Sequence, residues 1–260
     1  MKQFFKLYWK TLLFFALIGL IGGFFTGLYL LDSYPKNVQE QLIAELEAAG
    51  LGTIPTDILL GVITAAQAAG YGLILGAVGI VIAKKIGLWQ DERSITAKPL
   101  LLTILVSIVG GLLMIYADVL FFGRYSEVIM DSYATKPTIV YMLATVTYGA
   151  VIEEIMLRLF LMSLLALIIH KLSGGNDGKP TDKILIISNV IAALLFAAGH
   201  LPATFGLIGN SPLIIARCFL LNGGIGLAFG WLYRKYGLRY SMLAHGGCHL
   251  ISKLIWIFLI

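Results

Sequence analysis

The sequence predicts an all-α membrane protein, a polytopic bundle of about seven to eight transmembrane helices. Hydrophobic residues make up 59% of the 260-residue chain and charged residues only 13%, with a mean hydropathy of +0.91. Several apolar runs reach the roughly 20 residues that cross a bilayer as a helix. We therefore expect one integral membrane domain over residues 1–260, without a separate soluble domain.

Seven apolar runs are candidate spans. They cover residues 11–31, 58–83, 99–122, 138–170, 183–201, 213–233 and 240–260. As a helix, the run at 138–170 would be roughly 50 Å long, which exceeds the bilayer core, so it must project, break or tilt. Asn222, Gly223 and Gly224 would likewise interrupt the sixth span. We expect broken or unequal helices around an intramembrane site.

The charged residues indicate the orientation of the chain. The net charge of +5 comes from basic residues at the ends of apolar runs, which indicates membrane topology and not nucleic-acid binding. Loops rich and poor in basic residues alternate: residues 32–57 are mainly acidic, whereas Lys84 and Lys85 follow the second span. The positive-inside rule then predicts a cytoplasmic N-terminus. The first apolar run is too long for a secretory signal, so we expect it to be a retained span.

Three other features are interpreted as structural. Apolar residues at helical spacing in segment 37–49, opposite an acidic face, predict a short amphipathic helix on the membrane surface. Recurrent glycines in the first two spans predict close helix–helix packing, with a transport path through broken helices as the alternative. Cys218 and Cys248 lie in apolar runs, which favours buried thiols over a disulfide.

Charged side chains cluster in the stretch VIEEIMLRLF, residues 151–160. Ionisable groups at membrane depth are costly and mark functional candidates. Glu154 and Arg158 are four residues apart, in the order that favours an ion pair. Glu153 lies about 100° further round the helix, outside that pair, and a carboxylate without a cationic partner in apolar surroundings suits a general base. Alternatively, both glutamates hold Arg158 in a structural network.

Three of the four histidines lie in apolar runs of the second half. Phe196 and His200 are four residues apart, so the aromatic ring can pack against the imidazole. His245 and His249 share one helix face and would bind one metal ion or bracket a substrate carbonyl. The zinc-protease pattern His-Glu-x-x-His is absent. Asp118, near the end of the third span, is expected to reach the membrane interface.

This asymmetry between the halves predicts a scaffold in residues 1–137 and a catalytic core in residues 138–260. One carboxylate and three imidazoles on three helices can activate a water, by base catalysis or on a metal ion. The ligands of such a metal would be Glu153, His200, His245 and His249.

The motifs resemble the CPBP family (CAAX protease and bacteriocin-processing, also called Abi) of intramembrane endopeptidases. The similar positions are Glu153-Glu154-x-x-x-Arg158, Phe196-x-x-x-His200 and His245, and the resemblance covers roughly residues 138–255. It implies that Glu153 activates the water with help from His200. Glu154, Arg158 and Phe196 would support the site, and His245 would stabilise the reacting centre. The family usually has asparagine or aspartate four residues later, as part of an oxyanion hole, where this chain has His249.

The resemblance also implies the setting of the reaction. We expect a peptide or protein substrate, contact with membrane lipid, no nucleic acid and a bacterial plasma membrane. A glutamate–histidine dyad requires no cofactor, while a divalent metal remains the alternative. Two rival functions stay open: a non-proteolytic bacteriocin self-immunity or scaffold protein of the same fold, and a transporter. A transporter predicts an internal repeat, which the uneven distribution of charges does not show.

Overall fold

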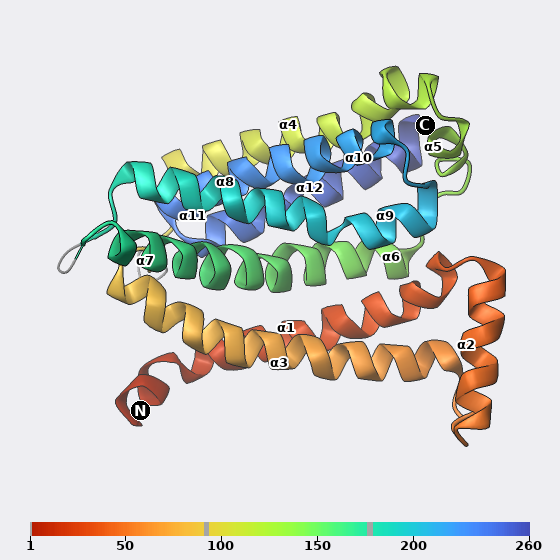
Figure 1. The fold of residues 1–260 in the computed structure, drawn as a ribbon, viewed down its shortest axis with the longest axis horizontal. Coiled ribbons are helices and arrows are strands. Elements are labelled where there is room, and N and C mark those ends of the chain that lie inside the picture. The colour runs from red at the N-terminus through yellow and green to blue at the C-terminus, as the bar shows by residue number, and fades with distance from the viewer. Residues whose placement is uncertain (1, 91–93, 176–178) are drawn as a thin grey trace.

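The computed structural model describes residues 2–90, 94–175 and 179–260, and these form a helical bundle without strands (Figure 1). Six stretches in the described part of the chain are long and apolar enough to cross a membrane. They are Gln3–Ser33, Thr56–Lys85, Ala97–Arg124, Asp182–Ile208, Pro212–Tyr236 and Leu238–Leu259. The all-α membrane fold expected from composition is therefore confirmed.

A further long helix follows the third of these stretches. It consists of α6 (Ile139–Ala144), two π-helical segments (Thr145–Glu153 and Ile155–Met162) and α7 (Ser163–Leu172). The chain stays helical throughout, so of the three alternatives for the 138–170 run, projection, break or tilt, a break does not occur. Wider π turns are common at functional sites; here Glu153 ends the first π-helical segment and Glu154 lies between the two.

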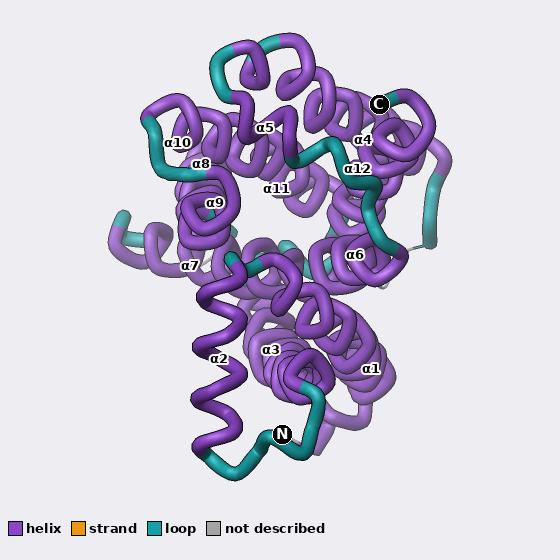
Figure 2. The backbone as a smooth tube through the Cα atoms, turned by 90° about the vertical axis from the view of Figure 1, so that its right-hand side faces the viewer, coloured by secondary structure: helices purple, strands orange, loops and turns teal. Residues whose placement is uncertain are grey.

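The helices α1 (Lys2–Ser33) and α3 (Thr56–Lys85) form a closely packed pair (Figures 1 and 2). Glycine makes this approach possible: a Cβ added at Gly19 would lie 2.7 Å from the carbonyl oxygen of Ala68. This confirms the packing role predicted for most of the glycines in these two spans, Gly70 excepted. The short helix α2 (Lys36–Ala48) joins the pair and buries no residue, in agreement with the amphipathic surface helix predicted at 37–49.

The remaining helices surround the other side of the α6–α7 helix (Figure 2). They are α4 (Ala97–Leu120), α5 (Glu127–Asp131), α8 (Asp182–Gly199), α9 (Leu201–Ile208), α10 (Pro212–Cys218), α11 (Ile225–Tyr236) and α12 (Leu238–Leu259), with a 3₁₀ turn at Phe122–Arg124. Between α10 and α11 the chain forms a π-helical segment, Phe219–Gly224. The predicted interruption at Asn222 is thus a widened turn and not a break.

Glycine also sets the depth of α12. Gly237 connects α11 to α12 as a single residue with φ of +103°, a conformation that suits glycine. The resulting tight turn places the beginning of α12 directly beside the end of α11, so Ser241 Oγ lies 3.0 Å from the carbonyl oxygen of Phe229. The same turn brings His245 to the level of the last turns of α8, where Phe196 lies.

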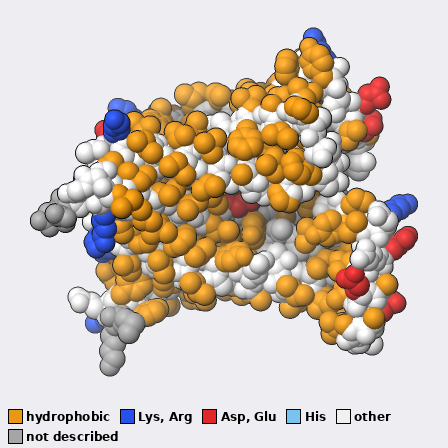
Figure 3. Space-filling model, viewed as in Figure 1, with side chains coloured by type: hydrophobic (Ala, Val, Ile, Leu, Met, Phe, Trp, Pro, Cys, Tyr) orange, Lys and Arg blue, Asp and Glu red, His pale blue; other side chains and the backbone are white. Residues whose placement is uncertain are grey.

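The molecular surface matches a protein embedded in lipid. Large apolar side chains such as Leu101 and Ile74 are about two-thirds exposed, at 66% and 65%. In Figure 3, hydrophobic side chains cover the middle of the molecule, whereas lysines, arginines and acids gather at its two ends. An uncharged band between charged ends is the pattern that a bilayer requires. The chain is therefore an integral membrane protein.

Candidate active site

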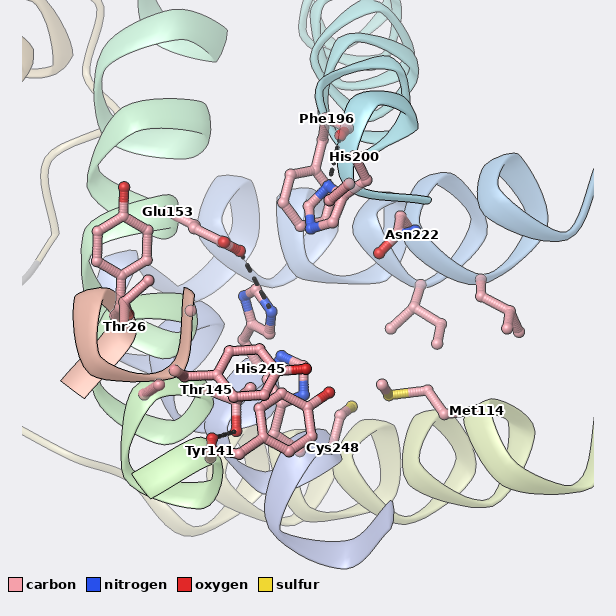
Figure 4. Close-up of a pocket in the computed structure, with 18 of the residues that line it drawn as sticks. Thr26, Met114, Tyr141, Thr145, Glu153, Phe196, His200, Asn222, His245 and Cys248 are labelled. Carbon is pink, nitrogen blue, oxygen red and sulfur yellow. Dashed lines mark hydrogen bonds and ion pairs between the residues drawn. The ribbon is translucent and has the colours of Figure 1, made fainter. Parts of the chain in front are cut away.

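A cavity of about 390 Å³ lies between the helices, and the predicted site residues line it. Glu153, Phe196, His200, His245 and His249 all face this space. Figure 4 shows Glu153, His200 and His245 approaching it from three different helices. His200 and His245 line the same cavity because the tight turn at Gly237 places the beginning of α12 beside the end of α11.

The cavity wall is not confined to the second half of the chain. Thr26 and Tyr29 from α1 and Met114 from α4 also line it. The first 137 residues therefore shape the site as well as support it. In Figure 3 the surface is hollowed between the α1–α3 pair and the remaining helices, and acidic atoms are visible inside the hollow.

Glu154 and Arg158 form the ion pair that their spacing predicts. Arg158 Nη1 lies 3.1 Å from Glu154 Oε1, and both side chains are almost completely buried. Arg158 also donates to the carbonyl oxygen of Gly226 at 2.9 Å. Its guanidinium lies 4.9 Å from the Phe196 ring centre and 5.6 Å from that of Phe229. The cation is thus held by one carboxylate, one carbonyl and two aromatic faces.

Glu154 has two more partners, which give it a second task. His245 Nδ1 lies 2.9 Å from Glu154 Oε1, and Ser241 donates its hydroxyl hydrogen to Glu154 Oε2. An ionised carboxylate next to Nδ1 holds a proton on that nitrogen and fixes the ring orientation. The Phe229 ring stacks on His245 with centroids 4.5 Å apart. Glu154 therefore holds one edge of the His245 ring and Phe229 one face, and Nε2 faces the cavity.

Glu153 has different surroundings from its neighbour. Its side chain is 21% exposed, and Oε2 lies 3.9 Å from His245 Nε2 (Figure 4). Arg158 pairs with Glu154 and not with Glu153. One glutamate therefore points into the buried network and the other into the cavity, as the helix geometry predicted.

His200 lies at the C-terminal end of α8, where backbone carbonyls lack helical partners. Its Nδ1 is 2.9 Å from the carbonyl oxygen of Phe196, which can only accept a hydrogen bond (Figure 4). Nδ1 must then carry the proton, and neutral His200 presents an unprotonated Nε2. The Phe196 ring packs edge-on against the imidazole, with centroids 4.6 Å apart. This is the shielding contact expected from their spacing.

His249 stacks on His245 one helical turn further along α12. The two ring centroids are 5.0 Å apart, and His249 Nδ1 lies 3.4 Å from Lys253 Nζ. A Cβ added at Gly149 would lie 3.3 Å from His249 Nε2 and 3.9 Å from Glu153 Oε2. The glycine therefore leaves room for the imidazole edge to approach Glu153.

No group of three or more histidine, cysteine, aspartate and glutamate residues within the described ranges is arranged to hold a metal ion. Cys218 and Cys248 are buried free thiols. Asn222 lines the cavity, and its Nδ2 donates to the Cys218 carbonyl oxygen at 3.1 Å (Figure 4). From the sequence, Asn222 is one of several polar residues in the apolar runs of the second half and a candidate helix breaker, but it was not predicted to line the site.

The expectation that Asp118 reaches the interface is wrong. Its side chain is fully buried, and both oxygens accept hydrogen bonds at 2.6 Å from Arg217. Tyr133 donates to the same carboxylate at 2.7 Å. Arg217 and Tyr133 line a second cavity of about 560 Å³, which shares His200 and Asn222 with the first. Asp118 and Arg217 are 99 residues apart, so no local spacing indicates this pair.

One comparison with known proteins covers the part of the chain that contains most of the cavity's polar residues. Residues 135–251 match the model of the family described as type II CAAX prenyl endopeptidase Rce1-like. No curated protein and no solved structure matches the chain. The matched range contains Glu153, His200, His245 and His249, whereas Lys253 and the helices α1 to α4 lie outside it. Over residues 135–251, somewhat under half of its length, the chain is similar to the Rce1-like family of CAAX endopeptidases, as the motifs indicated.

Proposed function

We propose that the protein is an intramembrane endopeptidase in which Glu153 and His200 activate a water molecule. The observation that carries the proposal is the difference in surroundings between the adjacent residues Glu153 and Glu154. Glu154 forms an ion pair with Arg158 and hydrogen bonds with His245 and Ser241, whereas Glu153 faces a cavity that three imidazoles also line. A carboxylate next to imidazoles in a cavity with mainly apolar walls is suited to general base catalysis.

The proposed reaction begins with a water between Glu153 and His200. Glu153 accepts one proton from the water, while the unprotonated Nε2 of His200 orients it. The water oxygen forms a bond to the scissile carbonyl carbon, and the carbonyl electron pair moves onto its oxygen. His245, when protonated on both nitrogens, donates from Nε2 to this oxyanion, with His249 beside it. The C–N bond then breaks, and the proton on Glu153 passes to the leaving amine.

The surroundings of the site suggest the class of substrate. The second cavity has a mixed lining of polar and apolar residues, whereas the first is lined mainly by hydrophobic and aromatic side chains. Such walls suit a peptide carrying apolar residues or a lipid modification, reached through contact with membrane lipid. The family name adds a CAAX peptide with a prenyl group as the first probe. We further propose a cytoplasmic N-terminus, a bacterial plasma membrane, no nucleic-acid partner and a metal-free dyad.

The test is cleavage by the purified protein in proteoliposomes. Internally quenched CAAX peptides, with and without a prenyl group, are incubated with the unaltered protein, and products are identified by mass spectrometry. We expect one new cleavage that Glu153→Ala abolishes and that His170→Ala retains, because His170 lies at the end of α7 away from the cavity. Metal analysis of the same sample, and cleavage that survives chelators, would support the dyad over a metal site.

A second candidate function rests on one specific observation, the imidazole at position 249. A histidine where the family usually has an amide would suit a non-proteolytic relative, such as a bacteriocin self-immunity or membrane scaffold protein. This alternative predicts that Glu153→Ala leaves a cellular immunity phenotype intact. Loss of both cleavage and phenotype in the same variant would instead support the peptidase.

A further inference from the structure

Lys253 is a buried cation next to the site, in a place that the proposed reaction does not use. The residue lies in the last helix, α12, and is only 3% exposed, although lysine side chains are rarely buried. Nζ lies 4.5 Å from the Tyr141 ring centre and 3.4 Å from His249 Nδ1. Among the described residues, this ammonium pairs with an imidazole and an aromatic face and with no carboxylate.

The contact with Lys253 decides which nitrogen of His249 carries the proton. In its charged form Lys253 has three N–H donors and no acceptor, so His249 Nδ1 then offers its lone pair. A second positive charge on His249, 3.4 Å from Nζ, would be strongly unfavourable in apolar surroundings. The imidazole is therefore neutral, and its single proton lies on Nε2.

The protonated nitrogen faces the reacting centre. His249 Nε2 and Glu153 Oε2 lie 3.3 Å and 3.9 Å from the same point, the position that a Cβ would occupy on Gly149. The N–H on Nε2 is thus directed to the side of the cavity where Glu153 would deliver the water. An amide at this position would carry an N–H in every state, whereas an imidazole offers one on this side only when the tautomer is fixed.

We propose that Lys253 is a positioning residue that fixes the Nε2–H tautomer of His249 and thereby makes this histidine a hydrogen-bond donor to the oxyanion. The proposal rests on the proposed peptidase function and explains how the site works without the usual asparagine or aspartate. His245, His249 and Lys253 follow each other at intervals of four residues along one face of α12. The donor and the group that orients it therefore sit on one rigid element.

The first test reads the tautomer directly and needs no substrate. The chain has four histidines, so ¹⁵N-histidine labelling in proteoliposomes gives few signals, and the His249 pair is assigned by its loss in His249→Asn. We expect a protonated Nε2 and an unprotonated Nδ1 in the unaltered protein and in Lys253→Arg. In Lys253→Met the Nδ1–H form should appear. An Nδ1–H tautomer in the unaltered protein, or an unchanged spectrum in Lys253→Met, would overturn the proposal.

The second test reads catalysis in two backgrounds. Loss of one oxyanion donor lowers kcat by about 10² to 10³, so Lys253→Met should lower kcat by up to about a hundredfold with little change in KM, and Lys253→Arg should restore most of it. In the His249→Asn background, where an amide supplies the N–H, Lys253→Met should have no further effect on kcat. An equal loss in both backgrounds would show that Lys253 is merely structural.

Two features keep these outcomes distinct. Should Lys253→Met fail to fold, Lys253→Gln replaces it, because an uncharged amide imposes no single tautomer on its neighbour. Should the unaltered protein cleave no peptide, the proposed function fails, while the ¹⁵N spectra still decide whether Lys253 fixes the tautomer of His249.

Discussion

The buried network around Glu154 makes a quantitative prediction about stability. In Glu154→Gln the carboxylate charge is lost, and Arg158 remains 1% exposed with no carboxylate partner. Breaking a buried pair in this way costs about 3–5 kcal/mol. The amide can still accept one of the hydrogen bonds from Ser241 or His245, so further losses are smaller. We expect Glu154→Gln to lower the free energy of unfolding by at least about 3 kcal/mol.

The neighbouring residue supplies a matched control. Glu153→Gln makes the same chemical change one position earlier, but Glu153 is 21% exposed and its closest ionic partner, His245 Nε2, is 3.9 Å away. It should change the free energy of unfolding by less than about 1 kcal/mol. Thermal unfolding in detergent separates the two variants, because 3 kcal/mol corresponds to a decrease in Tm of about 6 °C or more in a chain of this size.

The double variant Glu154→Gln/Arg158→Met refines this test. Replacing both partners removes the uncompensated cation, and such replacements recover much of the stability that the single change loses. The double variant should therefore unfold at a higher temperature than Glu154→Gln alone. The reasoning would be refuted by equal Tm values for Glu153→Gln and Glu154→Gln, or by a double variant less stable than either single one.

Three further predictions concern packing and the cavity wall. Gly19→Ala should lower stability by about 1–3 kcal/mol, because the new Cβ meets α3 backbone, whereas Gly70→Ala, with nothing within 4 Å, should not lower it; Tm values of both variants check this. Asp118→Asn should lower stability by about 2 kcal/mol or more, since Arg217 loses both short bonds, and an unchanged unfolding curve would contradict it. Phe196→Leu should lower kcat roughly tenfold by loosening the imidazoles that its ring contacts, as steady-state cleavage would measure.

Local spacing explains why part of the site could be predicted from the sequence. Glu154 with Arg158, Phe196 with His200 and His245 with His249 are each separated by four residues, and a helix brings such residues together whatever the fold. The structure contains all three contacts. Apolar runs likewise predicted the long helices, because a bilayer fixes their minimum length.

Contacts between distant segments could not be predicted in this way. Spacing offered no sign that Glu154 also holds His245, or that Asp118 pairs with Arg217 across 99 residues. The depth of His245 depends on the one-residue turn at Gly237, which a count of residues per span does not include. The turn helps to bring His245 to the cavity that His200 also lines.

The central claim is that Glu153 accepts the proton of the attacking water, and one measurement tests it most directly. The single-turnover rate of peptide cleavage in proteoliposomes is compared between the unaltered protein and Glu153→Gln, with equal amounts of folded protein confirmed by thermal unfolding. General base catalysis contributes about 10² to 10⁴ in rate, so Glu153→Gln should slow cleavage by at least about a hundredfold while its Tm stays unchanged. A folded Glu153→Gln protein that cleaves at the rate of the unaltered protein would contradict the account.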